Sequence, residues 1–129
     1  MSDEKKININ VKQFSFNKEI ELPENLKRFI KNKEEFLFAA KTNRDAAIIT
    51  DKKILICDKK GVTGKNREYF TIPYRKIISY GIEISGGFGK DPKLKIELPG
   101  QAIEIELLKD KNGELGLKIY DAIDAYMVE

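Results

Sequence analysis

Two glycine-rich stretches come closest to a chemical motif in this chain, since glycines at the right spacing could bind a phosphate group. In the first, Gly61-Val62-Thr63-Gly64-Lys65, two residues separate the glycines, fewer than the phosphate loop Gly-x-x-x-x-Gly-Lys-Ser/Thr requires. Asn66 also stands where that loop needs a Ser or Thr to hold magnesium. The residues that follow favour a strand, whereas a phosphate loop leads into a helix. We therefore interpret this stretch as the loop of a β-hairpin.

The second stretch, Gly86-Gly87-Phe88-Gly89, would have to match the dinucleotide-binding pattern Gly-x-Gly-x-x-Gly. It does not, because Pro92 stands where a further glycine would be needed. We interpret it as a connection between strands. The alternative is that Phe88, at the tip of the connection, contacts a partner.

Side chains that commonly act in catalysis are scarce. The chain contains no histidine, which removes Ser-His-Asp and Cys-His arrangements and the usual zinc sites. Cys57, the single cysteine, ends an apolar run and is interpreted as a packed residue rather than a reactive thiol. Glu104 and Glu106 are expected opposite lysines on a solvated strand face, not as a glycosidase pair. The sequence thus predicts no catalytic residues, no metal site and no cofactor, the alternative being a small enzyme that uses Asp, Glu and Lys.

Cations in two loops form the remaining candidate site. If successive strands alternate in direction, the loops at 41–44 and 58–66 emerge at the same end of the fold. An anion, a lipid headgroup or another partner could then bind five side chains gathered there: Lys41, Arg44, Lys59, Lys60 and Lys65. The alternative is that these are ordinary solvated side chains, because lysine is plentiful throughout the chain. Arg44 could also form an ordered pair with Asp45.

The composition indicates one soluble globular domain. Its 129 residues are enough for a single core, and 35% of them are charged while 41% are hydrophobic. The net charge is only +3, with residues 1–67 basic and residues 68–129 slightly acidic. No basic stripe interleaved with aromatic residues appears, so nucleic acid is not an expected partner.

The start of the chain and its cysteine content indicate one compartment. Met1-Ser2-Asp3-Glu4-Lys5-Lys6 leads into alternating residues rather than a continuous apolar run, so neither a signal peptide nor a transmembrane helix is predicted. A single cysteine cannot form an intramolecular disulfide, which suits a reducing compartment. We expect a cytoplasmic protein.

Short apolar runs separated by turn signals predict a β domain. Their length and their β-branched or aromatic content favour strands, and because no long helical pattern separates them, the sheet should be antiparallel. Five of these runs lie at 36–40, 46–49, 54–57, 69–72 and 77–82.

The first residues of the chain alternate less regularly than these runs. Residues 7–16 predict a short strand or a kinked arm. The predicted division is therefore an N-terminal arm or extra strand over 1–20 and one domain over 21–129.

The clearest hairpin joins residues 93–98 to residues 101–107. Its predicted partners are Leu98 and Gln101, Ile96 and Ile103, Leu94 and Ile105, Lys95 and Glu104, and Lys93 and Glu106. One face is then wholly aliphatic, and a slip by one residue would turn that face to water. Because Pro-Gly is not a favoured two-residue hairpin turn, a loop one pair wider is the alternative.

Two helices complete the prediction. Pro23 suits the first turn of a short amphipathic helix over 23–30. Asn112 is the expected N-cap of a terminal helix whose apolar stripe consists of Leu115, Ile119, Ala122, Ile123 and Tyr126. Strands followed by one helix favour a small β-barrel or sandwich capped by that helix.

The order of elements, together with several short motifs, resembles the bacterial pleckstrin-homology-like proteins, which are small single-domain chains. The motifs cover about half of the chain, and the rest agrees in element order. They are Arg44-Asp45, Thr50-Asp51-Lys52-Lys53, Asp58-Lys59-Lys60-Gly61-Val62-Thr63-Gly64-Lys65, Tyr69, Ile72-Pro73-Tyr74 and Lys76-Ile77.

The resemblance implies a seven-stranded, partly open antiparallel barrel of two near-orthogonal sheets with a C-terminal helix. It also implies homo-oligomers, often ring-shaped, and no enzymatic activity. The chain departs from the family in a longer, more polar start and in Lys53, which stands where an arginine is usual. Lys41-Thr42-Asn43-Arg44 is too short and too poor in basic residues to grip several phosphates, which argues against lipid binding by the route common in eukaryotic relatives.

Two hypotheses of different class follow. The first is a non-catalytic scaffold or protein-interaction domain that assembles with itself through exposed strand edges and also binds an unknown protein partner. The alternative is a module that binds anions or a membrane surface through the basic loops.

Overall fold

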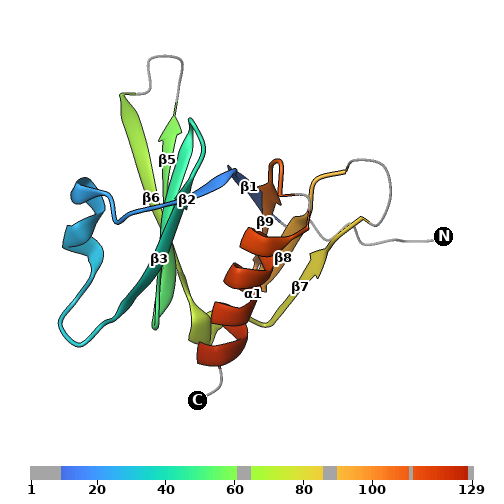
Figure 1. Ribbon diagram of the computed structural model, residues 1–129. Helices are drawn as coiled ribbons and strands as arrows, with labels where there is room; N and C mark the ends of the chain where they lie inside the picture. Colours follow the sequence, from blue (N-terminus) through green and yellow to red (C-terminus); the bar gives the residue numbers. More distant parts are fainter. Residues whose placement is uncertain (1–9, 61–64, 86–89, 111, 128–129) are drawn as a thin grey trace.

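Strands make up most of the structure, a computed structural model that describes residues 10–60, 65–85, 90–110 and 112–127 (Figure 1). The strands are β1 (Asn10–Phe16), β2 (Lys18–Ile20), β3 (Phe36–Lys41), β4 (Asp45–Thr50), β5 (Lys53–Lys60), β6 (Asn66–Pro73), β7 (Ser79–Glu83), β8 (Lys93–Leu98) and β9 (Gln101–Leu107). The helices are the 3₁₀ turns η1 (Glu24–Phe29) and η2 (Tyr74–Lys76) and the α-helix α1 (Glu114–Tyr126).

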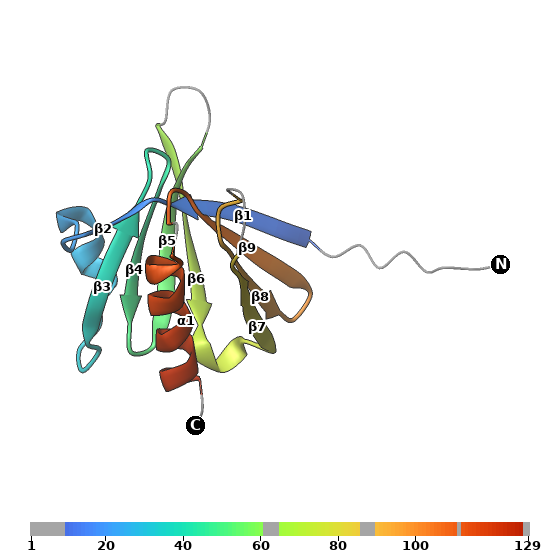
Figure 2. The same ribbon diagram turned by 45° about the vertical axis from the view of Figure 1, so that its right-hand side comes forward.

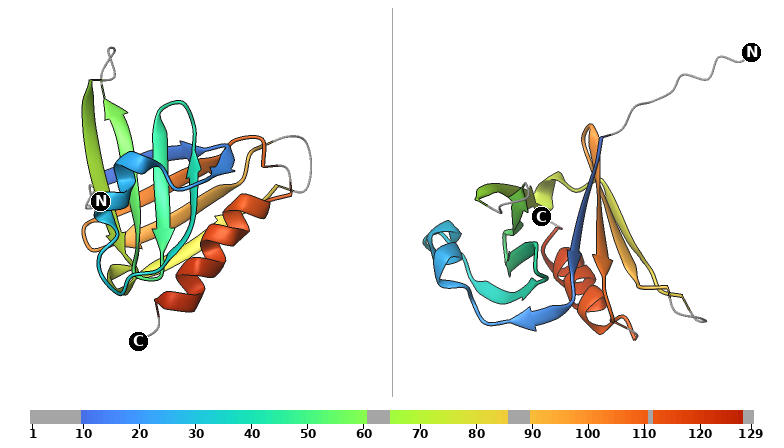
Figure 3. Two further views of the ribbon diagram at one scale, coloured as in Figure 1. Left: turned by 60° about the vertical axis from the view of Figure 1, so that its left-hand side comes forward. Right: turned by 90° about the horizontal axis from the view of Figure 1, so that it is seen from above.

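The strands form two sheets that pack face to face. The four-stranded sheet has the order β1-β9-β8-β7, and the five-stranded sheet has the order β2-β3-β4-β5-β6. The two sheets cross steeply in the left view of Figure 3, and they do not close into a full barrel (Figures 1 and 2). Side chains from both sheets and from α1 fill one apolar core. The predicted fold class, mainly β with a C-terminal helix, is confirmed.

The N-terminal strand lies at the edge of the four-stranded sheet. β1 runs parallel to β9, with Phe14 beside Ile105 and Phe16 beside Leu107. The prediction of an entirely antiparallel sheet is wrong for this pair, because nearly the whole domain connects the two strands and supplies the long crossover that parallel strands need. β3 to β9 are the seven expected strands, and β1 and β2 are additions to them. The division at residue 20 stays a prediction, and Phe14 and Phe16 belong to the common core.

The β8–β9 hairpin has the predicted register, from Leu98 opposite Gln101 to Lys93 opposite Glu106. Its turn is the two-residue Pro99-Gly100 rather than a wider loop, with Gly100 at a φ of 77° that glycine readily adopts. The alternate residues of both strands that face the other sheet are buried. Two ion pairs on the outer face run diagonally: Lys93 to Glu104 (3.8 Å) and Lys95 to Glu83 of β7 (3.7 Å).

The terminal helix begins differently from the prediction. Its N-cap is Gly113, in the left-handed region at φ 71°, and not Asn112. The carboxylate of Asp110 accepts hydrogen bonds from the backbone N–H groups of Leu115 (3.1 Å) and Gly116 (2.9 Å), which satisfies two of the donors at the helix start. Asp110 thus caps the start of the helix, the role predicted for Asn112.

The apolar stripe of the helix is confirmed in its centre. Ile119, Ala122 and Ile123 are buried in the core, whereas Tyr126 is partly exposed and stacks on Tyr74 with 6.1 Å between the ring centroids. Of the described residues, no helix is long and apolar enough to cross a bilayer.

The predicted helix over 23–30 is the 3₁₀ turn η1, which covers part of the outer face of the five-stranded sheet. Its buried residue Leu26 enters a second apolar cluster with Ala39, Ile48, Leu55 and Cys57. β4 and β5 are therefore buried on both faces where η1 lies, which explains why they read as continuous apolar runs rather than as alternating ones.

A buried ion pair fastens this covering segment to the sheet. Lys53 donates to Glu34 Oε1 (3.0 Å) and to the carbonyl oxygen of Phe29 at the end of η1 (2.7 Å). The hydroxyl of Thr50 donates to the same carboxylate, through Oε2 (2.5 Å). Tyr74 in turn donates to the carbonyl oxygen of Thr50 (2.7 Å), so the network also reaches η2.

Candidate functional site

Three of the five predicted cations line one surface pocket on the five-stranded sheet. Lys41 comes from the end of β3, Arg44 from the β3–β4 turn and Lys59 from β5. The pocket has a volume of about 760 Å³, within the range of small-ligand sites. Arg67 of β6 supplies a fourth cation, and Glu21 is an acidic residue at the rim.

The backbone fixes the position of Arg44. The hydroxyl oxygen of Thr42 accepts hydrogen bonds from the backbone N–H groups of Arg44 (3.3 Å) and Asp45 (3.1 Å), which shapes the tight β3–β4 turn. The guanidinium of Arg44 donates to the carbonyl oxygen of Lys59 (2.9 Å), while the Lys59 N–H donates to the Arg44 carbonyl (3.2 Å). The two basic loops therefore meet, as the alternation of strand directions predicted.

The structure describes less of the two remaining predicted cations, Lys60 and Lys65. Lys60 ends β5, and its side chain and residues 61–64 lie outside the described part of the structure; Lys65 is exposed just beyond them. β5 and β6 on either side pair antiparallel as far as Lys60 and Asn66, which supports the hairpin interpretation of the glycine stretch. The other stretch, residues 86–89, also falls outside the described residues.

Arg67 is the site residue that the sequence reasoning missed. It lies opposite Lys59 in the β5–β6 pair. The signal was available, since continuing the proposed hairpin outward from its loop would have paired these two positions.

Two carboxyl groups lie beside the cations. Asp45 is buried, and its register partner on β5 is Asp58. The pKa of Asp45 is raised to about 6, chiefly by burial and also by the hydrogen-bonded Asp58. The N–H of Ser15, which donates to this carboxyl group (2.9 Å), acts in the opposite direction. The charge of Arg44 acts to lower this pKa. The ordered pair of Arg44 with Asp45 stays a prediction.

β1 crosses the end of the five-stranded sheet at which the cations gather (Figure 2). Besides the contact of Ser15 with Asp45, Lys12 forms an ion pair with Glu68 of β6 (3.1 Å) and lies over the Phe70 ring, 5.1 Å from its centroid. The strand thus covers this end of the core. The cation pocket is on the outer face of the sheet, since its lining includes Ile20, Ala46 and Cys57 of the apolar cluster beneath η1.

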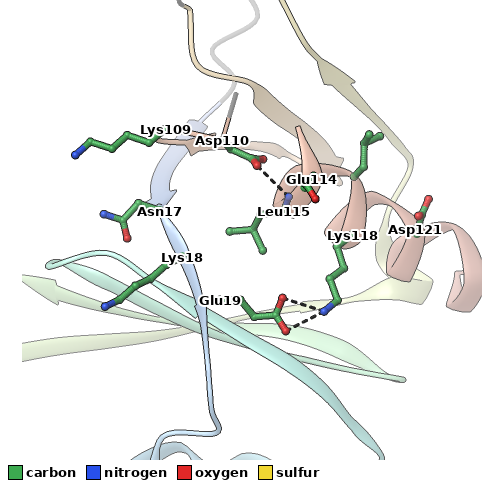
Figure 4. A pocket seen from close by; sticks show the side chains of 10 residues that line it. Asn17, Lys18, Glu19, Lys109, Asp110, Glu114, Leu115, Lys118 and Asp121 are labelled. Atoms are coloured by element: carbon green, nitrogen blue, oxygen red, sulfur yellow. Dashed lines mark hydrogen bonds and ion pairs between the residues drawn. The ribbon is translucent and has the colours of Figure 1, made fainter. Parts of the chain in front are cut away.

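A second pocket lies between the start of α1 and the bend from β1 to β2 (Figure 4). Three of its charged side chains have defined contacts: Lys118 pairs with Glu19 (2.8 Å) and lies over the Phe38 ring, and Asp110 caps the helix. Within the described residues, no three His, Cys, Asp or Glu side chains could together hold a metal ion. Chemistry by residues of this second pocket is not indicated.

Two crossed sheets, a C-terminal helix and a basic pocket at the strand turns define a protein of the pleckstrin-homology-like class. The family model described as the bacterial PH domain matches residues 6–127, and the chain belongs to that family.

Solved structures of similar proteins agree with this assignment. A DUF1696 family protein with a pleckstrin-homology domain from Shewanella loihica PV-4 is similar with a TM-score of 0.74 and 30% identity, covering 85% of this chain and 96% of that one. A pleckstrin homology domain from Shewanella amazonensis SB2B has a TM-score of 0.65 and 32% identity, covering 81% and 84%. YjqA, an uncharacterized protein of Bacillus subtilis strain 168, is 35% identical over 92 residues, which are 69% of this chain and 74% of that protein.

Proposed function

We propose that this chain is a non-catalytic interaction domain that assembles with copies of itself through an open strand edge. The observation that carries the proposal is the edge of β7, the last strand of the four-stranded sheet, which has no second strand beside it among the described residues. Open edges present unpaired backbone groups to other chains unless they are protected.

β7 has fewer protections than β6, an edge strand of the other sheet. β6, at the edge of the five-stranded sheet, contains Arg67 and ends in Pro73, and both residue types discourage pairing. β7 has the sequence Ser-Tyr-Gly-Ile-Glu, without lysine or proline. The large apolar side chains just before and just after it, Ile78 and Ile84, are 58% and 39% exposed. An association through β7 would cover apolar surface that is otherwise in water.

The mass of the protein in solution tests this proposal. We expect size-exclusion chromatography with light scattering to give a multiple of 14.8 kDa over a range of protein and salt concentrations. A mass of one chain throughout that range would refute self-assembly. A cytoplasmic location and an unidentified protein partner go with the proposal and need separate tests.

The cation pocket supports a second candidate function, the binding of an anion. Lys41, Arg44, Lys59 and Arg67 come from four strands or turns that the sheet brings together, and the Arg44 side chain is already held by its hydrogen bond to the Lys59 carbonyl. Less conformational entropy is lost on binding when a side chain is preorganised in this way.

Inorganic phosphate and anionic vesicles distinguish the sources of such an anion. For the phosphate-binding reading, Arg67→Glu should weaken binding of inorganic phosphate at least about tenfold, a loss of about 1.4 kcal/mol, whereas Lys76→Glu, at an exposed lysine of η2, should not. For the membrane reading, phosphatidylserine vesicles should sediment the protein at low ionic strength and release it as salt rises. Equal effects of the two variants would exclude the pocket as the binding site.

A further inference from the structure

The strand ends at the cation pocket carry opposite charges on the two faces of the five-stranded sheet. The outer face carries the four cations of the pocket: Lys41, Arg44, Lys59 and Arg67. An acidic residue adjoins three of these cations in the chain, and the acidic residues form one row, because Asp45 pairs with Asp58, and Asp58 pairs with Glu68. Directly paired residues point to the same face of a sheet, and successive residues of a strand point to opposite faces. This acid row therefore lies on the inner face.

Contacts with β1 agree with this placement of the acid row. The Ser15 N–H donates to Asp45 (2.9 Å), and Lys12 forms an ion pair with Glu68 (3.1 Å). Asp45 is 6% exposed, so its carboxyl group is held between the sheet and β1, while the cations on the other face line a surface pocket.

The surroundings of Asp45 contain charges of both signs. The groups that face it come from its own turn and from the neighbouring strands: Arg44, Ser15 and Lys12 of β1, Asp58 of β5, and Glu68 of β6. The Thr42 hydroxyl, which is uncharged, accepts from the Asp45 backbone N–H (3.1 Å). Burial and the hydrogen-bonded Asp58 raise the pKa of Asp45 to about 6, so its charge changes close to neutral pH.

We propose that anion binding in the cation pocket is coupled to protonation of Asp45, so that the pocket holds an oxyanion more tightly when this carboxyl group carries its proton. This inference rests on the anion binding proposed above. The ligand is a sulfate or phosphate group, either free or at the head of a lipid. The bound anion in turn favours the protonated carboxyl group, because coupling between two binding equilibria is reciprocal.

Arg44 connects the pocket with the acid row. It adjoins Asp45 in the chain and acts on its charge, and its guanidinium lies in the pocket, where it donates to the Lys59 carbonyl oxygen (2.9 Å). When Asp45 is ionised, its negative charge cancels part of the positive potential that an anion meets in the pocket, and it also repels the anion directly. Burial strengthens this repulsion, because the protein interior screens charge less than water does. Protonation of Asp45 removes it.

Sulfate is a suitable probe of this coupling, because its charge is constant between pH 5 and pH 7.5. The chain contains no histidine, the side chain that most often titrates in this range. We expect isothermal titration calorimetry at constant ionic strength to show sulfate binding at least about fivefold more tightly at pH 5 than at pH 7.5. Arg67→Glu should weaken sulfate binding at both pH values, which places the sulfate in the pocket.

Asp45→Asn imitates the protonated carboxyl group at every pH. We expect this variant to bind sulfate equally well at both pH values, and about as tightly as the unsubstituted chain does at pH 5. Asp121→Asn, at an exposed position of α1, changes the net charge by the same amount and should keep the pH dependence.

A measurement on the unsubstituted chain decides the matter if Asp45→Asn does not fold. NMR titration of the Asp45 carboxyl carbon should give a higher pKa in saturating sulfate than without sulfate, because the coupling is reciprocal. A pKa that sulfate leaves unchanged would overturn the coupling.

Vesicles of phosphatidylglycerol distinguish a lipid headgroup from a free oxyanion, since the charge of this lipid is also constant between pH 5 and pH 7.5. Stronger sedimentation of the protein at pH 5, which Asp45→Asn makes independent of pH, supports coupling to a headgroup. A pH effect seen with sulfate and not with vesicles supports coupling to a free oxyanion.

Failure of the coupling and failure of anion binding are distinguishable. If neither sulfate nor vesicles bind at either pH, or if Arg67→Glu leaves their binding unchanged, both the proposed anion binding and this inference are removed. Binding in the pocket that is equally tight at both pH values leaves anion binding standing but overturns the coupling. A pH dependence that persists in Asp45→Asn overturns it too, because another group then carries the proton.

Discussion

Asp45 is a buried carboxyl group whose protonation is coupled to folding. Its pKa is raised from an ordinary 3.8 to about 6, so the folded chain binds this proton more tightly than the unfolded chain does. The stabilisation from that proton is complete below pH 3.8 and is lost as the pH rises through 6. Above that pH the buried Asp45 carboxylate is charged next to Asp58.

Asp45→Asn should remove this loss. The amide imitates the protonated carboxyl group, since it can accept from Ser15 and donate to Asp58. The difference in unfolding free energy between the variant and the unsubstituted chain, measured with urea, should shift in favour of the variant between pH 4 and pH 8. We expect this shift to be on the order of 2–3 kcal/mol. If the unfolding free energies of the two proteins changed with pH in parallel, Asp45 would not be the group that couples protonation to stability.

Lys53 tests the buried ion pair. Its side chain is 15% exposed and that of Glu34 is 4% exposed, so Lys53→Ala leaves an uncompensated charge in the protein. We expect a loss of about 3–5 kcal/mol in unfolding free energy. Lys27→Ala removes an exposed partner of Glu24 and should cost less than about 1 kcal/mol. Similar losses in both variants would mean that burial does not set the value of these pairs.

The same cluster explains a lowered pKa. Burial alone would raise the pKa of Glu34, but the N–H of Lys31, the Thr50 hydroxyl and Lys53 together hold it below its ordinary value. The stabilisation from this carboxylate is present above pH 4.5 and is lost as the pH falls through the folded pKa. Glu34 and Asp45 therefore act in opposite directions on stability in acid.

At the scale of elements, α1 depends on a cap that its sequence does not display at the expected place. Asp110→Ala removes the acceptor for two backbone N–H groups and should cost about 0.5–2 kcal/mol in thermal or urea unfolding. Asn112→Ala, at the exposed position that the local pattern favoured, should cost little. The reverse order of effects would restore Asn112 as the cap.

The elements also show which parts of a fold a sequence can specify. The β8–β9 hairpin was predicted to the residue, because alternation and a two-residue turn leave one register that buries the aliphatic face. The parallel place of β1 was not predictable from alternation, since its partner lies at the far end of the chain. The meeting of Arg44 with Lys59 followed from strand direction, whereas the place of Arg67 required continuing the β5–β6 hairpin outward from its loop to the pair with Lys59.

At the scale of the whole molecule, the first strand is part of the core rather than an appendage. Deleting residues 1–20 removes Phe14 and Phe16, which are 5% and 0% exposed. We expect the shortened chain to lose its cooperative melting transition, and Phe16→Ala alone to cost about 3–5 kcal/mol. Val11→Ala, at an exposed position of the same strand, is the matched control. An unchanged melting temperature after the deletion would establish 21–129 as an independent domain.

The parallel pair of β1 and β9 also has a consequence for synthesis on the ribosome. Gln13 and Glu104, whose side chains are in contact across this pair, are 91 positions apart. β1 leaves the exit tunnel long before β9 and therefore has no partner in its sheet until β9 has emerged. During translation Phe14 and Phe16 are therefore in a nascent chain whose native contacts form late, and this domain can complete its folding only after residues 101–107 have been synthesised.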